Sequence, residues 1–210
     1  MARISVFIDG FNLYHSIVNE KFPSLAKYRW LNIAKLVEIF VSPKKHTIKI
    51  FYFTSLAEWS PNKVVKHEIF IKALESTGIK PIYGKFKLVD KKCGAICKKY
   101  YQTFEEKRTD VNIAINLFQM AEKEYDQAVI LSGDSDLIPA VEAVRTIYPR
   151  KKIGVIIPIN GNAVELMSYC NWHTQITQKQ LATSQFQSPL NVSPTEMLIC
   201  PPEWLLPLRP

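Results

Sequence analysis

The sequence predicts an α/β domain in which a mostly parallel sheet is covered by helices on both faces. Short, continuously apolar runs, which are typical of buried parallel strands, recur along the chain, for example at Ala128–Leu131 and Ile153–Ile157. Segments with apolar residues at helical spacing alternate with them, and Thr109 to about Lys123 is the clearest. This alternation is the pattern of strand–helix–strand units, which build parallel sheets.

The N-terminal part of the chain alternates between strand and helix signals. Its first apolar run ends in Asp9-Gly10, and residues at helical spacing follow directly. Pro61 suits the first turn of a later helix, and Gly78 suits its end. In order, we expect strand Ile4–Ile8, helix Phe11–Val18, helix Leu31–Phe40, strand Thr47–Phe53, helix Pro61–Ser76 and strand Ile79–Tyr83.

A hairpin is expected to interrupt the alternation at about residues 84–104. Lys85 to Tyr101 alternates in polarity around the turn-like segment Asp90-Lys91-Lys92-Cys93-Gly94. In order, we then expect helix Thr109–Lys123, strand Gln127–Leu131, helix Ser135–Ile147, strand Lys152–Ile157, helix Asn162–Tyr169 and edge strand Thr174–Thr177.

The regular pattern ends at about Leu181, and prolines concentrate between Pro189 and Pro210. We therefore expect one domain over residues 1–180 and a Pro-rich tail over 181–210 that is extended or disordered. Trp204, Leu205 and Leu206 leave docking of this tail open.

The composition is that of a globular protein with an excess of positive charge. The formal net charge of +8 favours a polyanionic partner, with nucleic acid first and an anionic membrane surface second. The longest apolar runs are of strand length and far shorter than a membrane span. Asp9 interrupts the first apolar run, so no signal peptide is expected and the predicted location is cytoplasmic.

The four cysteines are too few and too scattered for a disulfide framework, so we expect free thiols. Cys93 and Cys97 share the predicted hairpin tip, which raises the alternative of a structural zinc site. Such a site needs four ligands, and Cys170 and His173 are the candidates to complete it.

Aspartates stand where predicted strands end or predicted helices begin. Asp9 ends the first strand, Asp110 opens a helix, and Asp134 and Asp136 follow the strand Gln127–Leu131. The carboxyl ends of parallel strands share one edge of the sheet, so we expect these side chains to converge. Several carboxylates without clustered histidine or cysteine suit Mg²⁺ or Mn²⁺, which prefer oxygen ligands.

One or two such ions can activate water, orient a phosphodiester and stabilise the leaving oxygen. Without a metal, neighbouring carboxylates repel one another and have raised pKa values. The alternative is that each aspartate caps a helix, as Asp134 could do after Gly133 and Asp110 at its helix start. The occurrence of all four aspartates at such positions favours a shared site.

Cations and aromatic residues alternate through the predicted hairpin and up to Asp110. Cations for phosphates and aromatic faces for bases are what proteins use to bind single-stranded nucleic acid. A solvated hairpin with its aromatic residues in the core is the alternative. The cations are Lys85, Lys87, Lys91, Lys92, Lys98, Lys99, Lys107 and Arg108, and the aromatic residues are Phe86, Tyr100, Tyr101 and Phe104.

Three segments occur in an order and spacing that we identify with a known family. They are Val6-Phe7-Ile8-Asp9-Gly10-Phe11-Asn12-Leu13, Glu106-Lys107-Arg108-Thr109-Asp110-Val111 and Leu131-Ser132-Gly133-Asp134-Ser135-Asp136-Leu137. The sequence resembles the NYN domain, a branch of the PIN-like nuclease superfamily, over about residues 3–177. The resemblance implies a Rossmann-like, PIN-type three-layer sandwich and a Mg²⁺- or Mn²⁺-dependent ribonuclease site.

The resemblance also implies roles for individual residues. The catalytic, metal-binding set would be Asp9, Asp110, Asp134 and Asp136, and Asn12 would be the polar catalytic residue that follows the first aspartate. Ser132 and Lys107 match motif positions and are expected near the phosphate of the substrate, as is the neighbouring Arg108. Independently of the resemblance, the alternation of cations and aromatic residues predicts that Lys91, Lys92, Lys98 and Lys99 bind RNA, single-stranded RNA in particular.

Other functions stay open. A catalytically weak PIN-like module could bind RNA or a protein partner and act as a regulator, and a homodimer is a further alternative. DNA could replace RNA, because no residue reveals a reader of the 2′-hydroxyl group. A phosphatase of the haloacid-dehalogenase type is excluded because Phe11 stands where its second aspartate is needed, and phosphate-loop and dinucleotide fingerprints are absent from the sequence.

Overall fold

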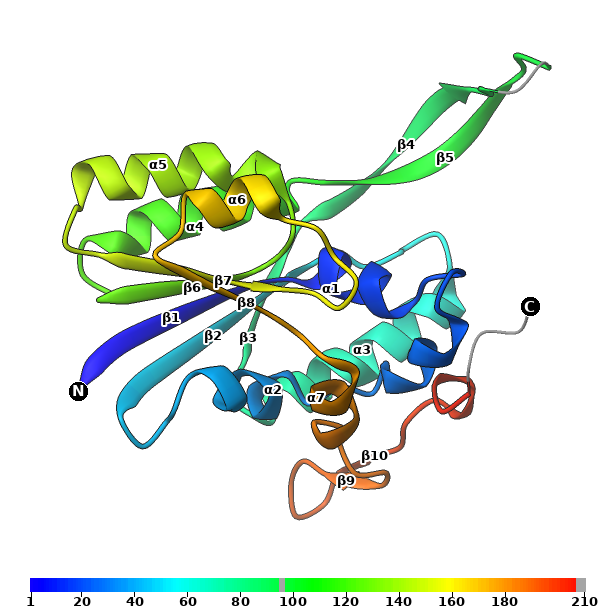
Figure 1. Cartoon of the computed structure of the whole chain (residues 1–210). Coiled ribbons are helices and arrows are strands. Elements are labelled where there is room, and N and C mark those ends of the chain that lie inside the picture. Colours follow the sequence, from blue (N-terminus) through cyan, green and yellow to red (C-terminus); the bar gives the residue numbers. More distant parts are fainter. Residues whose placement is uncertain (95–96, 207–210) are drawn as a thin grey trace.

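The computed structural model describes residues 1–94 and 97–206 and contains a six-stranded sheet between two layers of helices (Figure 1). The strand order is β3-β2-β1-β6-β7-β8, and every neighbouring pair is parallel. The strands are β1 (Ala2–Asp9), β2 (His46–Thr54), β3 (Lys80–Tyr83), β6 (Gln127–Leu131), β7 (Lys152–Ile157) and β8 (Trp172–Gln175). The predicted α/β fold class is confirmed.

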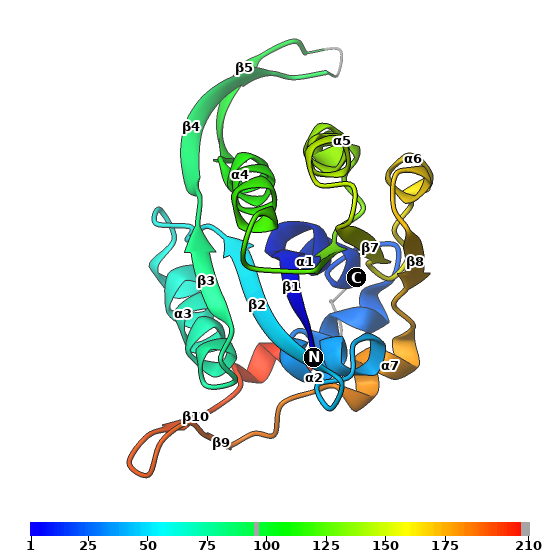
Figure 2. The same ribbon diagram turned by 90° about the vertical axis from the view of Figure 1, so that its left-hand side faces the viewer.

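Helices cover both faces of this sheet (Figure 2). They are α1 (Gly10–Ile17), α2 (Ile33–Phe40), α3 (Pro61–Glu75), α4 (Thr109–Ala121), α5 (Ile138–Ile147), α6 (Val164–Ser168) and α7 (Gln178–Thr183), with short 3₁₀ turns η1 (Pro23–Tyr28), η2 (Ser135–Leu137) and η3 (Pro202–Trp204). Helices α4, α5 and α6 lie on one face, and α1, α2, α3 and α7 lie on the other. In the described part of the chain, no helix has the length and apolarity needed to cross a membrane.

Two hydrophobic cores result, one on each face of the sheet. In β1, Ile4, Val6 and Ile8 pack into the core between the sheet and α1–α3. Phe7 packs into the other core, between the sheet and α4–α6. Successive strand residues point to opposite faces, so a strand buried on both sides must be apolar at nearly every position. The same alternation places Asp9 on the face of Phe7, toward α4.

Three predicted helices, expected from Leu31, Ser135 and Asn162, begin two or three residues later, at Ile33, Ile138 and Val164, and side-chain chemistry explains the first two. Helix α2 begins at Ile33 because Asn32 Oδ1 accepts the Lys35 N–H at 3.0 Å and caps the helix. The predicted helix Ser135–Ile147 is divided into η2 and α5. Pro139 has no N–H group to extend a helix from η2, so it occupies the first turn of α5.

The predicted hairpin is present and forms a separate two-stranded antiparallel sheet that projects from the domain (Figures 1 and 2). Its strands are β4 (Lys85–Lys92) and β5 (Tyr100–Lys107). We call the hairpin formed by β4 and β5 the arm. It is longer than the expected range of about 84–104, because β5 continues to Lys107 and only Arg108 separates it from α4. The turn-like segment Asp90 to Gly94 begins within β4, which continues to Lys92, and residues 95–96 of the hairpin lie outside the described residues.

Residues 181–206, the main part of the segment expected to be an extended or disordered tail, pack against the domain. A short hairpin joins β9 (Leu190–Asn191) to β10 (Met197–Leu198), and Phe186 and Cys200 are buried. The Trp204 ring lies 6.4 Å from Trp30 and 5.9 Å from Phe70, measured between ring centroids. These apolar side chains follow no helical or strand period, so periodicity could not reveal their packing.

Candidate metal centre

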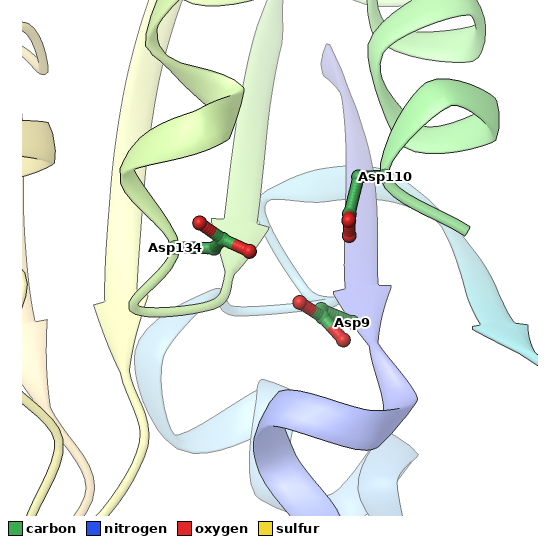
Figure 3. A group of neighbouring side chains, drawn as sticks. All are labelled: Asp9, Asp110 and Asp134. Carbon is green, nitrogen blue, oxygen red and sulfur yellow. The ribbon is translucent and has the colours of Figure 1, made fainter. Parts of the chain in front are cut away.

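Three aspartates converge at the carboxyl edge of the sheet (Figure 3). Asp9 ends β1, Asp134 follows β6, and Asp110 lies in the first turn of α4. One carboxylate oxygen from each lies within 4.8 Å of the others. Asp9 is 4% exposed, and the other two side chains are partly buried. Because β1 and β6 are adjacent parallel strands, residues that are distant in sequence meet here.

After Asp9 the chain passes so close to β2 that only a glycine fits. A Cβ atom on Gly10 would lie 2.6 Å from the Phe53 carbonyl oxygen and 2.7 Å from the Tyr52 ring. Helix α1 can therefore begin immediately beside β2. Asp9 Oδ1 accepts the Asn12 N–H at 2.9 Å, so Asp9 caps α1 while it also faces the other two aspartates.

Ser132 and Asn12 hold the loop after β6 against the start of α1. Ser132 Oγ donates to Asp9 Oδ2 at 2.9 Å and accepts the Asp134 N–H at 3.1 Å. Asn12 Oδ1 accepts the Gly133 N–H at 2.9 Å. Ser132 was expected near the substrate phosphate, but its side chain is fully buried. These contacts favour a positioning role for both residues.

Asp136, the fourth predicted aspartate, is exposed and lies outside the three-carboxylate group among the described residues. Its N–H donates to Asp134 Oδ1 at 2.9 Å, which forms the tight turn of η2. That turn buries Leu137 and leaves the Asp136 carboxylate at the surface. Asp136 remains close enough for its charge to contribute to the raised pKa of Asp110.

The electrostatics of the three-aspartate group are those of crowded carboxylates. Burial raises the pKa of Asp110 to about 6, and the charges of Asp9, Asp134 and Glu106 add to that increase. Burial also raises the pKa of Asp9, against the hydrogen bonds from Asn12 and Ser132. A cation bound between the carboxylates would relieve this repulsion. An all-oxygen donor set fits Mg²⁺ or Mn²⁺.

Glu106 is a fourth acidic group beside the centre, and sequence reasoning assigned it no role. Its Oε1 accepts the Ser55 hydroxyl at 3.2 Å, the Thr109 N–H at 3.2 Å and the Thr109 hydroxyl. A Cβ atom on Gly84 would lie 2.8 Å from the same oxygen and 2.6 Å from the Ser55 and Thr109 hydroxyl oxygens, so a larger residue there would displace these side chains. The signal available in the sequence was its place in the same motif as Asp110.

The predicted cationic residues are distributed along the arm. Lys107 and Arg108 lie at the junction of β5 and α4, and Arg108 adopts a left-handed conformation with φ of 79°. Lys107 Nζ lies 2.8 Å from one Glu105 carboxylate oxygen, and Lys91 Nζ lies 2.5 Å from the other. Lys92, Lys98 and Lys99 are exposed toward the distal end of the hairpin.

The zinc alternative does not assemble in the structure. Within residues 1–94 and 97–206, the three-aspartate group is the one cluster of at least three potential ligands. Cys93 and Cys97 lie at the distal end of the hairpin and are free thiols, as are Cys170 and Cys200. They are not gathered with His173 into a four-ligand site.

The fold and the site define a class of α/β protein in which acidic side chains at the carboxyl edge of a parallel sheet could hold a metal ion. Residues 3–185 match the NYN domain, and the chain belongs to that family, which is nuclease-like. The predicted resemblance is therefore confirmed, and the match extends beyond the six-stranded sheet through α7.

Two further similarities accompany the family match. The chain is 24% identical over 242 aligned positions to 6-hydroxy-3-succinoylpyridine 3-monooxygenase HspA of Pseudomonas putida, covering 96% of this chain and 75% of that protein. It also resembles the crystal structure of a Vibrio parahaemolyticus protein of unknown function, with a TM-score of 0.54 and 18% identity, over 84% of this chain and 93% of that one. The second similarity is evidence for the fold alone.

Proposed function

We propose that the protein is a ribonuclease that hydrolyses RNA phosphodiester bonds at the three-aspartate centre with Mg²⁺ or Mn²⁺. The observation that carries the proposal is the convergence of Asp9, Asp110 and Asp134 from three separate elements to within 4.8 Å. Helix capping accounts for the Asn12 contact of Asp9. Capping does not explain why three carboxylates lie together in one partly buried place, where they repel one another.

In this proposal Asp9, Asp110 and Asp134 hold the cation, and the exposed Asp136 stands beside them toward solvent. A bound Mg²⁺ or Mn²⁺ would activate water and offset charge on the phosphate. Ser132 would hold Asp9 and Asp134 in place relative to each other, because its hydroxyl group hydrogen-bonds the Asp9 carboxylate and the Asp134 N–H. Asn12 acts from the other side of that loop through the Gly133 N–H.

The cationic side chains are proposed to bind the RNA backbone. Lys107 and Arg108 come immediately before the helix that carries Asp110, so they would contact a phosphate near the centre. Lys91, Lys92, Lys98 and Lys99 would extend this interaction along the arm. The net charge of +8 supports the same partner, because phosphate contacts supply most non-specific affinity for nucleic acid.

The first test is cleavage of labelled single-stranded RNA and DNA by the purified wild type and Asp134→Asn, each with Mn²⁺, Mg²⁺ or EDTA. We expect cleavage of RNA that needs the metal and is lost in the variant. Because one relative is named for a monooxygenase reaction, the products must be identified directly as shortened strands.

Two outcomes would contradict the proposal. Equal cleavage by Asp134→Asn would show that the reaction occurs elsewhere or belongs to a contaminant. No cleavage by the wild type, with salt-sensitive RNA binding retained, would favour the catalytically weak regulatory module instead.

A further inference from the structure

The two faces of the β4–β5 hairpin differ in chemistry. Directly paired residues of an antiparallel ladder share a face, and successive residues alternate between faces. The pairs Phe86↔Glu106 and Leu88↔Phe104 therefore lie on one face, and Lys87↔Glu105 lies on the other. The second face also carries the pairs Lys85↔Lys107 and Lys91↔Tyr101. One face near the domain is thus aromatic, and the opposite face is rich in lysine.

The aromatic face is extended by two rings from other parts of the chain. Trp59, in the segment between β2 and α3, stacks on Phe104 with 3.8 Å between ring centroids and 2° between ring planes. Phe86 meets Trp59 edge to face at 4.5 Å. Phe11 meets Phe86 in the same manner at 5.4 Å. We call Phe11, Phe86, Trp59 and Phe104 the aromatic row.

The aromatic row begins beside the metal centre. Phe11 is two residues from Asp9, and Glu106 lies on the hairpin face of Phe86 while it bonds Thr109 at the start of α4. Trp59 and Phe104 nevertheless remain 39% and 37% exposed. Large aromatic side chains that stack yet stay this accessible form a surface rather than a core.

We propose that the aromatic row is a base-stacking subsite, which makes the substrate of the metal centre an RNA strand with unpaired bases. This inference rests on the proposed nuclease function. Flat apolar rings suit the faces of unpaired bases, which a duplex does not offer. Cations for the phosphates lie at both ends of the row. Lys92 lies on the same face, toward the distal end of the hairpin, with its Nζ 5.8 Å from the Tyr100 ring centroid, whereas Lys85 and Lys107 lie on the opposite face at the end nearest the domain.

The subsite is tested by equilibrium binding of a fluorescent oligouridylate to the full chain in EDTA, where metal-dependent cleavage cannot occur. Loss of one stacking partner is worth about 1–3 kcal/mol, so Trp59→Ala should weaken binding about 5- to 150-fold. Trp59→Phe should bind within a few-fold of the wild type. Phe22→Ala is the matched control, because Phe22 is an aromatic side chain of similar exposure (41%) outside the row.

Two further measurements separate stacking from a structural effect of the substitution. Binding of an abasic sugar–phosphate strand should be the same for the wild type and Trp59→Ala. Oligouridylate should quench tryptophan fluorescence in the wild type, and that quenching should be largely lost in Trp59→Phe. An equal loss of abasic binding, unchanged oligouridylate affinity in Trp59→Ala, or Trp59-dependent binding of duplex RNA would each overturn the subsite.

The subsite and the nuclease function can fail separately. Base-dependent binding through Trp59 without any metal-dependent cleavage would retain the subsite and reject the nuclease. Metal-dependent cleavage with oligouridylate affinity unaffected by Trp59→Ala would retain the nuclease function and reject the subsite.

Discussion

The acidic centre and the β4–β5 hairpin solve opposite structural problems. At the centre, like charges are held within 4.8 Å of one another by adjacent strands and a helix that are rigidly packed on two hydrophobic cores. The described part of the hairpin has no second layer over most of its length, and its lysines are exposed. Repulsive groups need a rigid frame, whereas a two-stranded arm tolerates charge and exposure. The centre therefore suits chemistry, and the arm suits recognition.

The two regions meet where the sign of the charge changes. Strand β5 ends at Lys107, Arg108 makes the left-handed turn, and α4 presents Asp110 in its first turn. A strand of RNA that follows the arm would reach the carboxylates at this junction. Substitutions in each region test whether the two are separable in this way.

The largest effect is expected for the centre itself. Asp9→Asn should reduce RNA cleavage about 100-fold or more, because the substitution removes a buried carboxylate of the proposed metal centre that is also the partner of Ser132. Asp136→Asn should reduce it about 10-fold or less, since that carboxylate is exposed and outside the group. Initial rates at saturating Mn²⁺ measure both. Equal losses would make Asp136 a full member of the metal site.

The next effect concerns the arm. Reversing Lys91, Lys92, Lys98 and Lys99 to glutamate should weaken RNA binding about 10- to 100-fold and flatten its salt dependence, by about 0.7 in slope for each phosphate that the protein no longer neutralises. Lys91 should contribute least because Glu105 already neutralises it. Reversal of Lys44 and Lys45, just before β2 at the opposite edge of the sheet, is the matched control. An unchanged salt slope in the hairpin variant would remove the arm from RNA binding.

Metal binding should stabilise the fold through the centre and not through the arm. At about 100 times its dissociation constant, Mn²⁺ should add about 2.7 kcal/mol of unfolding free energy, or about 5–10 °C in Tm. Thermal unfolding with Mn²⁺ and with EDTA measures this shift. The four-lysine variant should keep it, and Asp134→Asn should lose most of it. A full shift in Asp134→Asn would place the ion elsewhere.

The smallest effect is a gain of stability in the metal-free protein. Asp110→Asn should raise the unfolding free energy by about 1 kcal/mol near pH 7, after allowance for the solvent exposure of Asp110, because it removes a carboxylate whose pKa is raised to about 6. The folded state binds this proton more readily than the unfolded chain, so wild-type stability rises relative to the variant as the pH falls from about 6 toward the ordinary value of 3.8. The gain should therefore disappear at low pH.

Urea unfolding in EDTA at neutral and mildly acidic pH measures that difference. Asp90→Asn, on the exposed hairpin, serves as the control and should change little at either pH. A destabilised Asp110→Asn at neutral pH would mean that Asp110 is a structural cap and not one of several repelling charges.

The sequence by itself determined the strands that are buried along their length. The predicted bounds of β6 and β7 agree with the structure residue for residue, because strands buried on both faces must be apolar at nearly every position. The position of three aspartates on one edge also followed from the sequence, since parallel topology brings the carboxyl ends of strands together. These inferences need only the local pattern and the rule by which such segments assemble.

Only the tertiary structure decided which polar groups face one another. The separation of Asp136 from the other aspartates depends on the tight turn of η2, and the approach of Glu106 depends on the close start of the hairpin at Gly84. The stacking of Trp59 on Phe104 and the packing of residues 181–206 join segments that share no periodic pattern. Such contacts depend on register and side-chain direction, and neither is encoded in the spacing of residues along a single segment.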